Sequence, residues 1–248
     1  RSDGTLVAWG FNNDYGQCSV PFPYDRFVAV AAGALHSLAL RENGSIEAWG
    51  RNVSGQCSVP QPNEDFVAIA AGLYFSLGLK KDGSIVAWGD NRWGQCEVPE
   101  PNEGFVAIAA GYTHCLALKQ DGSVVAWGSN MYGECEVPEG GKGFVVIAAG
   151  NYFSVGVRED GSVRVWGSMG ERFRPFEGPN EGFVQVATNW DHSLALTHEG
   201  TIVGWGNNDE GQCDVPEPNQ DFVAVAAGIK FSLALKRDGT IVAWGRDW

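Results

Sequence analysis

The pattern of apolar and polar positions repeats along the whole chain, and the repeated sequence is here called the phrase. Residues 66–104 have the sequence FVAIAAGLYFSLGLKKDGSIVAWGDNRWGQCEVPEPNEG, and nearly the same phrase begins again at Phe105. Seven Trp-Gly pairs follow at intervals of 39 residues, except for a first interval of 40. A period this regular predicts a repeat protein with a single domain over residues 1–248. The copies open at Phe27, Phe66, Phe105, Phe144, Phe183 and Phe222.

Each copy predicts four short strands joined by tight turns. In residues 66–104 these are the runs FVAIAAG, FSLGLK and SIVAWG and the segment GQCEVP, which a proline ends. Lys-Asp-Gly between strands two and three is a hairpin signal, and Gly94 before strand four is expected at a positive φ angle. Strands one and two are almost entirely apolar, which predicts that both of their faces are covered.

Four-stranded sheets of about 40 residues, stacked face to face, are typical of a β-propeller. The fold class is therefore predicted to be all-β, a β-propeller of four-stranded antiparallel blades, with a solenoid as the alternative repeat architecture. Residues 5–9 and 17–20 match strands three and four, and the chain ends with strands one to three. The closing blade is thus expected to be built from both termini, which gives six blades. Seven is the alternative if terminal residues are missing.

The repeated phrase resembles the repeat of the regulator-of-chromosome-condensation family. The resemblance rests on residues 82–95 (DGSIVAWGDNRWGQ) and 32–40 (AGALHSLAL), and it extends over the whole chain. The short period is closer to that of the bacterial members, including the propeller-type β-lactamase inhibitor protein, although that inhibitor has seven blades. The resemblance implies a propeller that presents loops on one face, as an exchange factor, an inhibitor or a scaffold. It carries no catalytic motif over to this chain.

Composition and charge narrow the classes of partner. Apolar residues make up 44% of the chain, charged residues 19%, and the formal net charge is −13. An acidic surface repels phosphate backbones, so no nucleic-acid partner is expected. The apolar runs are only about seven residues long, which excludes membrane insertion by a helix. The charge favours a basic or neutral protein partner, or it only keeps the domain soluble.

Cysteine and histidine are the residues to test for metal or covalent chemistry. Five of the six cysteines occupy equivalent positions, and in a ring of blades such positions lie about 20 Å apart, too far for a disulfide. They are expected to be small buried hydrophobes. His36, His114 and His192 alternate with phenylalanine at the start of strand two and are expected to make structural hydrogen bonds. We predict no metal, no cofactor and no catalytic residue, and therefore no enzyme activity.

The positions that change from copy to copy carry the functional prediction. The loops after strand one and after strand three are expected on the same face, and they collect tyrosine, tryptophan and arginine, the usual anchors of protein interfaces. The alternative is that each aromatic ring covers the edge of its own blade. The predicted partner-binding residues are Tyr15, Tyr74, Arg92, Trp93, Tyr112, Tyr132, Tyr152, Arg172, Phe173 and Trp190.

One copy departs from the phrase. Residues 172–182 have the sequence RFRPFEGPNEG in place of GQCEVPEPNEG, and Thr188-Asn189 replaces the usual Ala-Gly. The basic and aromatic residues of this segment are either a partner contact or a decayed outer strand. Both departures precede Trp190 closely, so this copy is a natural first target for mutation.

The leading interpretation is a non-enzymatic binding module that presents an aromatic loop face to a protein partner, with enzyme inhibition as one use. The alternatives are a structural or assembly module of a larger surface or extracellular protein, a carbohydrate-binding propeller and, from the family alone, an exchange factor for a small GTPase. We expect a monomer or one module of a larger chain. The start at Arg1, without Met, and one strand-three segment more than six blades require favour trimming from a larger chain. The location is unknown, and a secreted or cell-surface protein is favoured over a cytoplasmic one.

Overall fold

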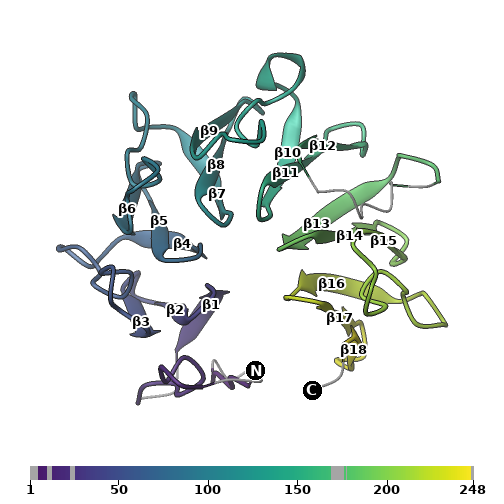
Figure 1. Ribbon diagram of the computed structural model, residues 1–248, viewed down its shortest axis with the longest axis horizontal. Helices are drawn as coiled ribbons and strands as arrows, with labels where there is room; N and C mark the ends of the chain where they lie inside the picture. The colour runs from purple at the N-terminus through teal and green to yellow at the C-terminus, as the bar shows by residue number, and fades with distance from the viewer. Residues whose placement is uncertain (1–4, 10–12, 23–25, 169–175, 177, 247–248) are drawn as a thin grey trace. The chain divides into compact units, whose positions relative to one another are not determined.

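A computed structural model describes residues 5–9, 13–22, 26–168, 176 and 178–246 of the protein. The described strands form six three-stranded antiparallel sheets, one for each copy of the phrase (Figure 1). The all-β prediction and the six repeats are confirmed. The chain divides into two compact units, unit 1 with Arg1–Gln120 and Val125–Ser129, and unit 2 with Asp121–Val124 and Asn130–Trp248.

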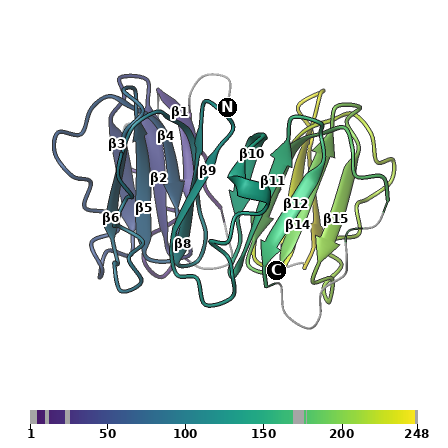
Figure 2. The same cartoon turned by 90° about the horizontal axis from the view of Figure 1, so that it is seen from above.

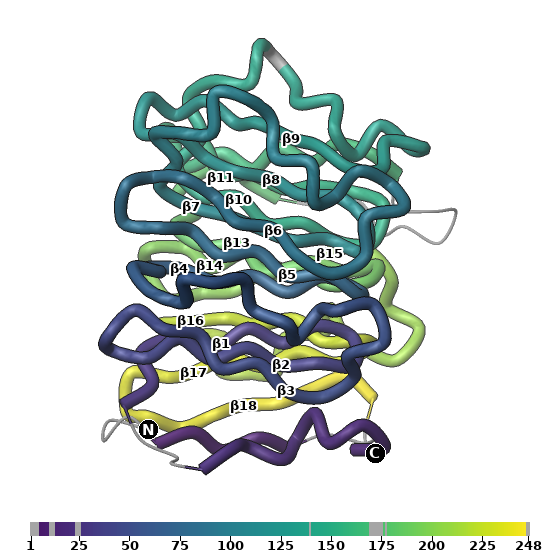
Figure 3. The backbone as a smooth tube through the Cα atoms, turned by 90° about the vertical axis from the view of Figure 1, so that its left-hand side faces the viewer, coloured from purple at the N-terminus to yellow at the C-terminus, as the bar shows by residue number. Residues whose placement is uncertain are grey.

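Unit 1 contains three sheets in chain order, which Figure 3 shows one after another from the purple end. In each sheet the second strand lies between the first and the third. The first strands of successive sheets contact each other. The strands are β1 (Phe27–Ala32), β2 (His36–Arg41), β3 (Ile46–Gly50), β4 (Phe66–Ala71), β5 (Phe75–Lys80), β6 (Ile85–Gly89), β7 (Phe105–Ala110), β8 (His114–Lys119) and β9 (Val124–Gly128), of which only Val124 belongs to unit 2.

Unit 2 repeats this arrangement after a short 3₁₀ helix, η1 (Glu139–Gly141). Within each unit the strands run side by side, with the turns gathered at their two ends (Figure 2). Among the described residues no helix has the length and apolar character needed to cross a bilayer. The strands of unit 2 are β10 (Phe144–Ala149), β11 (Phe153–Arg158), β12 (Val163–Gly167), β13 (Phe183–Asn189), β14 (His192–Thr197), β15 (Ile202–Gly206), β16 (Phe222–Ala227), β17 (Phe231–Lys236) and β18 (Ile241–Gly245).

The hydrophobic core lies between consecutive sheets. Leu38 and Leu40 of β2 pack against Phe66 and Trp88 of the following sheet, and the same packing recurs in unit 2. Within each unit, a sheet therefore buries one face against the next sheet, which explains why the phenylalanine and tryptophan of the phrase recur. In the last sheet, Ile241 is 57% exposed, because no further sheet follows β18 among the described residues.

The first strand of each sheet is less covered than its apolar sequence predicts. Val28 and Val30 of β1 are 59% and 58% exposed. β1 pairs only with β2, and the register shifts between Phe27 and Ala29, which leaves Val28 out of the ladder. The prediction that strand one is covered on both faces is therefore wrong, because the valine after the opening phenylalanine is 43–59% exposed in all six copies. The prediction holds for the middle strands, such as β5.

The predicted fourth strand is an irregular segment that fastens one sheet to the next. Residues 55–59 form turns and no ladder, and residues 5–9 and 17–20 form no strand either. The Gln56 carbonyl oxygen accepts hydrogen bonds from Trp88 Nε1 and Ser76 Oγ of the following sheet, both at 2.9 Å. Gln212 makes the same pair of contacts with Trp244 and Ser232. The carbonyl group thus accepts hydrogen bonds from side chains of the next copy and takes no part in a strand ladder.

Candidate functional site

The loops after strand one and after strand three lie on the same side of each sheet. In unit 1, Asp90 N donates to Tyr74 O at 2.9 Å. The same bond recurs from Arg51 to Leu35, Ser129 to Thr113, Ser168 to Tyr152, Asn207 to Asp191 and Arg246 to Lys230. We call these loops the loop surface of their unit. In unit 1 it comprises residues 13–16, 34–35, 51–55, 73–74, 90–94 and 112–113, and in unit 2 residues 130–133, 151–152, 190–191, 207–211 and 229–230.

The glycine of each Trp-Gly pair permits the two loops to approach. Gly89 has a φ of 109°, and a Cβ atom there would lie 2.6 Å from Tyr74 O and 2.8 Å from Phe75 Cα. Distances this short exclude any side chain unless the backbone moves. The glycine therefore recurs because the backbone contact between the two loops requires it.

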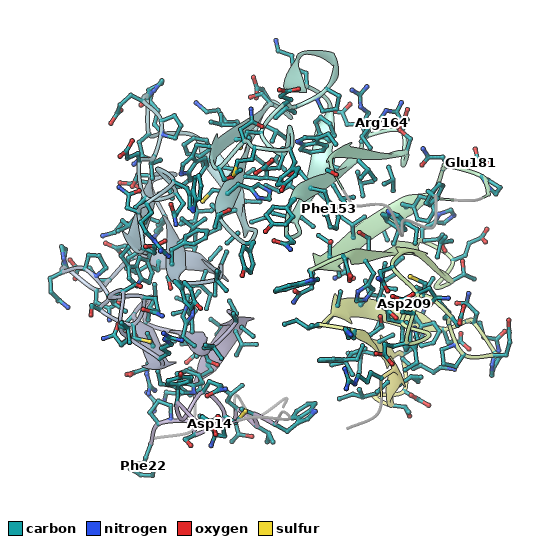
Figure 4. All side chains as sticks on the ribbon, viewed as in Figure 1. Asp14, Phe22, Phe153, Arg164, Glu181 and Asp209 are labelled. Atoms are coloured by element: carbon teal, nitrogen blue, oxygen red, sulfur yellow. The ribbon has the colours of Figure 1, made fainter. Side chains whose placement is uncertain are left out.

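The loop after strand three is held by polar side chains of its own copy. Asn91 Oδ1 accepts a hydrogen bond from Cys96 N at 2.8 Å, and the buried Gln95 accepts one from Trp93 N at 2.8 Å through Oε1. Gly94, predicted at a positive φ angle, has a φ of 75°. The same frame recurs around Asn13, Asn52, Asn130 and Asn208. It presents the residue at the loop centre, here Trp93, without needing that residue's side chain. Asp14 and Asp209 mark two such loops in Figure 4.

Two tyrosines of unit 1 that were predicted to bind a partner lie against Arg51, which was not among the predicted residues. The guanidinium carbon of Arg51 lies 5.0 Å from the centre of the Tyr15 ring and 5.2 Å from that of the Tyr74 ring. Tyr15 is 47% exposed, and Tyr74 and Arg51 are half-buried. Comparison of the copies could have identified Arg51, because four other copies have an acidic or neutral polar residue at the equivalent position: Asp90, Ser129, Ser168 and Asn207.

The other predicted residues of unit 1 flank this group. Arg92 Nε lies 2.8 Å from Asp90 Oδ1, and this hydrogen bond raises the pKa of the guanidinium. Trp93 is 48% exposed. Tyr112 is half-buried, and its carbonyl oxygen accepts a hydrogen bond from Leu73 N at 3.3 Å, so its loop adjoins the loop of Tyr74.

In unit 2 the structure brings Tyr132 and Tyr152 together. Their ring centres are 4.7 Å apart, and the rings are 50% and 36% exposed. Trp190 is 38% exposed and has a φ of 30°, in a tight turn after a β13 that the Thr188-Asn189 replacement extends by one residue. Arg172 and Phe173 lie outside the described residues, so their predicted role is not tested.

The aromatic residue that can be placed in the departing segment belongs to the core. Phe176 packs edge-on against Phe183 and Trp205, with ring centres 5.5 Å and 5.4 Å away. Trp205 is fully buried. Phe176 therefore fills space between sheets, and the expectation that it contributes to a partner contact is not supported.

The histidines at the start of strand two make buried hydrogen bonds. His36 Nε2 lies 3.0 Å from Ser76 Oγ, and His192 Nε2 lies 2.9 Å from Ser232 Oγ. Each serine gives its only proton to a glutamine carbonyl, so it accepts from Nε2–H and leaves Nδ1 unprotonated. Burial lowers the pKa of both imidazoles to about 4. The predicted structural role is confirmed for these two. Within the described part of the chain, no group of three or more His, Cys, Asp or Glu is placed to hold a metal ion.

The six cysteines form no disulfide, and we expect Cys57, Cys96 and Cys135 to react slowly in the folded protein. Burial is the largest cause that raises the pKa of Cys57 and Cys96 to about 11 and that of Cys135 to about 12. With a pKa of about 11, roughly one thiol in a thousand is ionised at pH 8, against about a quarter for an unperturbed cysteine. A thiol reagent at pH 8 should label the three within seconds in urea and far more slowly without it. Equal rates in both conditions would contradict the burial.

Sheets of one repeat, each fastened to the next by a carbonyl group and a shared core, define a repeat β-propeller protein. The model of the Regulator of chromosome condensation (RCC1) repeat matches residues 27–56, 66–95, 105–134, 144–171, 183–212 and 222–247. The chain belongs to this family.

Solved structures show the same fold. Prp20p from Saccharomyces cerevisiae, described together with its binding to Gsp1p and histones, is similar with a TM-score of 0.76 and 20% identity, over 91% of this chain and 73% of that one. The CRINKLY WD40 ectodomain of the Arabidopsis thaliana receptor kinase ACR4 has a TM-score of 0.72 and 25% identity, over 88% and 80% of the two chains. Human WBSCR16 has a TM-score of 0.69 and 16% identity, over 88% and 76%. Comparison with curated proteins finds no match.

Proposed function

We propose that the protein is a non-enzymatic binding module whose loop surface meets a protein partner. The observation that carries the proposal is that Tyr15, Trp93 and Tyr132 are 47–50% exposed at the centres of loops whose backbone N–H groups are already held by a glutamine or glutamate side chain. Their rings are therefore not needed to fold the loops. Large exposed aromatic rings on an ordered backbone lose little entropy on binding and are frequent interface anchors.

The comparisons support a protein as the partner. Prp20p is described as binding Gsp1p and histones, and Kap60 has been solved bound to yeast RCC1 (Prp20). Inhibition of an enzyme is the finer form of this proposal. A loop surface that keeps its backbone fixed can cover an active site without rearranging, which lowers the entropic cost of association.

A triple alanine variant tests the proposal. We expect Tyr15→Ala, Trp93→Ala and Tyr132→Ala together to weaken binding by about 100-fold or more, because a buried aromatic anchor contributes about 2 kcal/mol. Partners should first be captured by the wild-type protein and identified by mass spectrometry. Each binary Kd is then measured by calorimetry with the purified partner.

The control replaces an equally large set of exposed apolar residues away from these loops. Val28, Val67 and Val106 are 52–59% exposed on the first strands, and Val→Thr preserves their shape. Both variants should keep the circular-dichroism spectrum and melting temperature of the wild type. The proposal fails if the folded aromatic variant binds as tightly as the wild type, or if the valine variant loses affinity equally.

A further inference from the structure

Arg51 is a clamped cation that pairs with no carboxylate among the described residues. It lies between the Tyr15 and Tyr74 rings, and its guanidinium donates no hydrogen bond to any residue that the structure describes. Other arginines of unit 1 behave differently, since Arg41 pairs with Glu47 at 3.3 Å and Arg92 pairs with Asp90 at 2.8 Å. The chain has 30 acidic residues against 17 lysines and arginines, so carboxylates are plentiful, yet none of those that the structure describes pairs with Arg51.

An equivalent arginine elsewhere in the chain shows which group can pair with the guanidinium at this position. Arg246 and Glu210 stand five copies after Arg51 and Tyr15, at the equivalent positions. There the guanidinium of Arg246 lies 3.7 Å from Glu210 Oε1, and Lys230 lies 3.4 Å from the same oxygen. The backbone frame is the same, because Glu210 N donates to Gln212 as Tyr15 N donates to Gln17. In unit 1 the tyrosine replaces the internal carboxylate and leaves the arginine open to an external one.

The flanking rings suit that role. A guanidinium stacked between two aromatic faces keeps its planar fork of N–H donors directed outward at the edge of the stack. That fork matches the two oxygens of a carboxylate, and the charge-assisted bonds are stronger when nearby rings exclude water. Clamping also removes the side-chain entropy that a free arginine loses on binding.

We propose that Tyr15, Arg51 and Tyr74 form an anchoring site for the carboxylate of an aspartate or glutamate in an exposed loop of the partner protein. The inference rests on the proposed function and adds the chemistry of one contact. The protein has a net charge of −13. Recognition of an acidic loop is therefore a short-range contact rather than long-range attraction, since charges are screened beyond about 8 Å at physiological salt.

The first test needs no partner. Acetate replaces chloride at constant ionic strength, and the side-chain Nε–H signals of Arg51 and Arg246 are followed by NMR in ¹⁵N-labelled full-length protein. We expect the Arg51 signal to shift saturably and the Arg246 signal to stay, because Glu210 already occupies Arg246. Tyr15→Glu should abolish the Arg51 response, and Glu210→Ala should create one at Arg246.

Three results would overturn the inference. One is an Arg51 response no larger than that of Arg92, which is paired with Asp90. Another is a response that survives Tyr15→Glu in a folded variant. The third is a saturable response to inorganic phosphate with none to acetate, since that would identify a different anion.

The second test uses the partner captured as described above. Arg51→Ala should raise the Kd by about tenfold or more, as expected for the loss of a charge-assisted hydrogen bond. Arg246→Ala should leave the Kd unchanged. If acetate binds but no partner is found, the proposed function fails and the carboxylate site stands. If the partner binds Arg51→Ala as tightly as the wild type, the contact is refuted and the proposed function stands.

Discussion

Lowering the pH from 6.5 towards 4 is expected to reduce the free energy of unfolding by up to about 3 kcal/mol for each of His36 and His192. Both imidazoles are buried and neutral, and burial lowers their pKa from 6.5 to about 4. Since the folded pKa is the lower one, the unfolded chain binds the proton first. The stabilisation is complete above pH 6.5 and is lost as the pH falls towards 4. Urea unfolding at half-unit steps of pH measures it.

The alternate copies supply the control substitution. Phe75 and Phe231 occupy the position of His36, and all three rings lie against the glycine of their own copy, whereas the copy of His192 has Asn189 there. His36→Phe should therefore fold, and it should flatten the pH dependence by about one proton. Ser76 and Ser232 keep their bonds to the glutamine carbonyls. An unchanged slope in the folded His36→Phe variant would refute the assignment.

Carboxylates of the hairpin turns act in a different pH window. Side-chain and backbone hydrogen bonds from Ser84 lower the pKa of Asp82 below 3.8, and Asp121 and Asp160 have the same arrangement. Their contribution is present above pH 3.8 and is lost as the pH falls further. A loss between pH 6.5 and 4 therefore does not arise from these three carboxylates.

Gly89→Ala is expected to destabilise the protein by about 3 kcal/mol or more, because the new Cβ would meet backbone atoms that cannot yield cheaply. The matched control is Gly55→Ala. Gly55 also has a positive φ, 80°, but a Cβ there meets nothing within 4 Å, so only the conformational cost of about 1 kcal/mol is expected. Melting temperature and urea midpoint measure the difference. Similar losses in the two variants would show that the φ angle, and not the contact with Tyr74 O, makes the glycine necessary.

The repeat period was sufficient to predict the strands because the core is periodic. A phenylalanine such as Phe66 begins each first strand and a Trp-Gly pair ends each third one, since both rings fill the space between consecutive sheets. The fourth segment could not be predicted in the same way. Its residues look like a strand, but the donors that claim the Gln56 carbonyl come from Trp88 and Ser76, 32 and 20 residues away in the next copy.

The candidate site could also be predicted only in part from the repeat. Comparison of equivalent positions selected Tyr15 and Tyr74, because neither recurs in every copy. It did not select Arg51, because the contact that matters joins three different columns of the repeat rather than one. Tyr15, Arg51 and Tyr74 are 36 and 23 residues apart, and the fold places both tyrosine ring centres within 5.2 Å of the Arg51 guanidinium carbon.

The hydrogen bonds that hold the loop after strand three use fixed polar residues and leave the central side chain of the loop free to vary. At its centre the chain places Tyr15, Ser54, Trp93, Tyr132 and Glu210, and in each case a glutamine or glutamate oxygen accepts the backbone N–H. The bond uses no atom of the central side chain. These positions can therefore diversify one at a time at little cost in stability, so a new binding specificity can evolve, or be engineered, on an inherited scaffold.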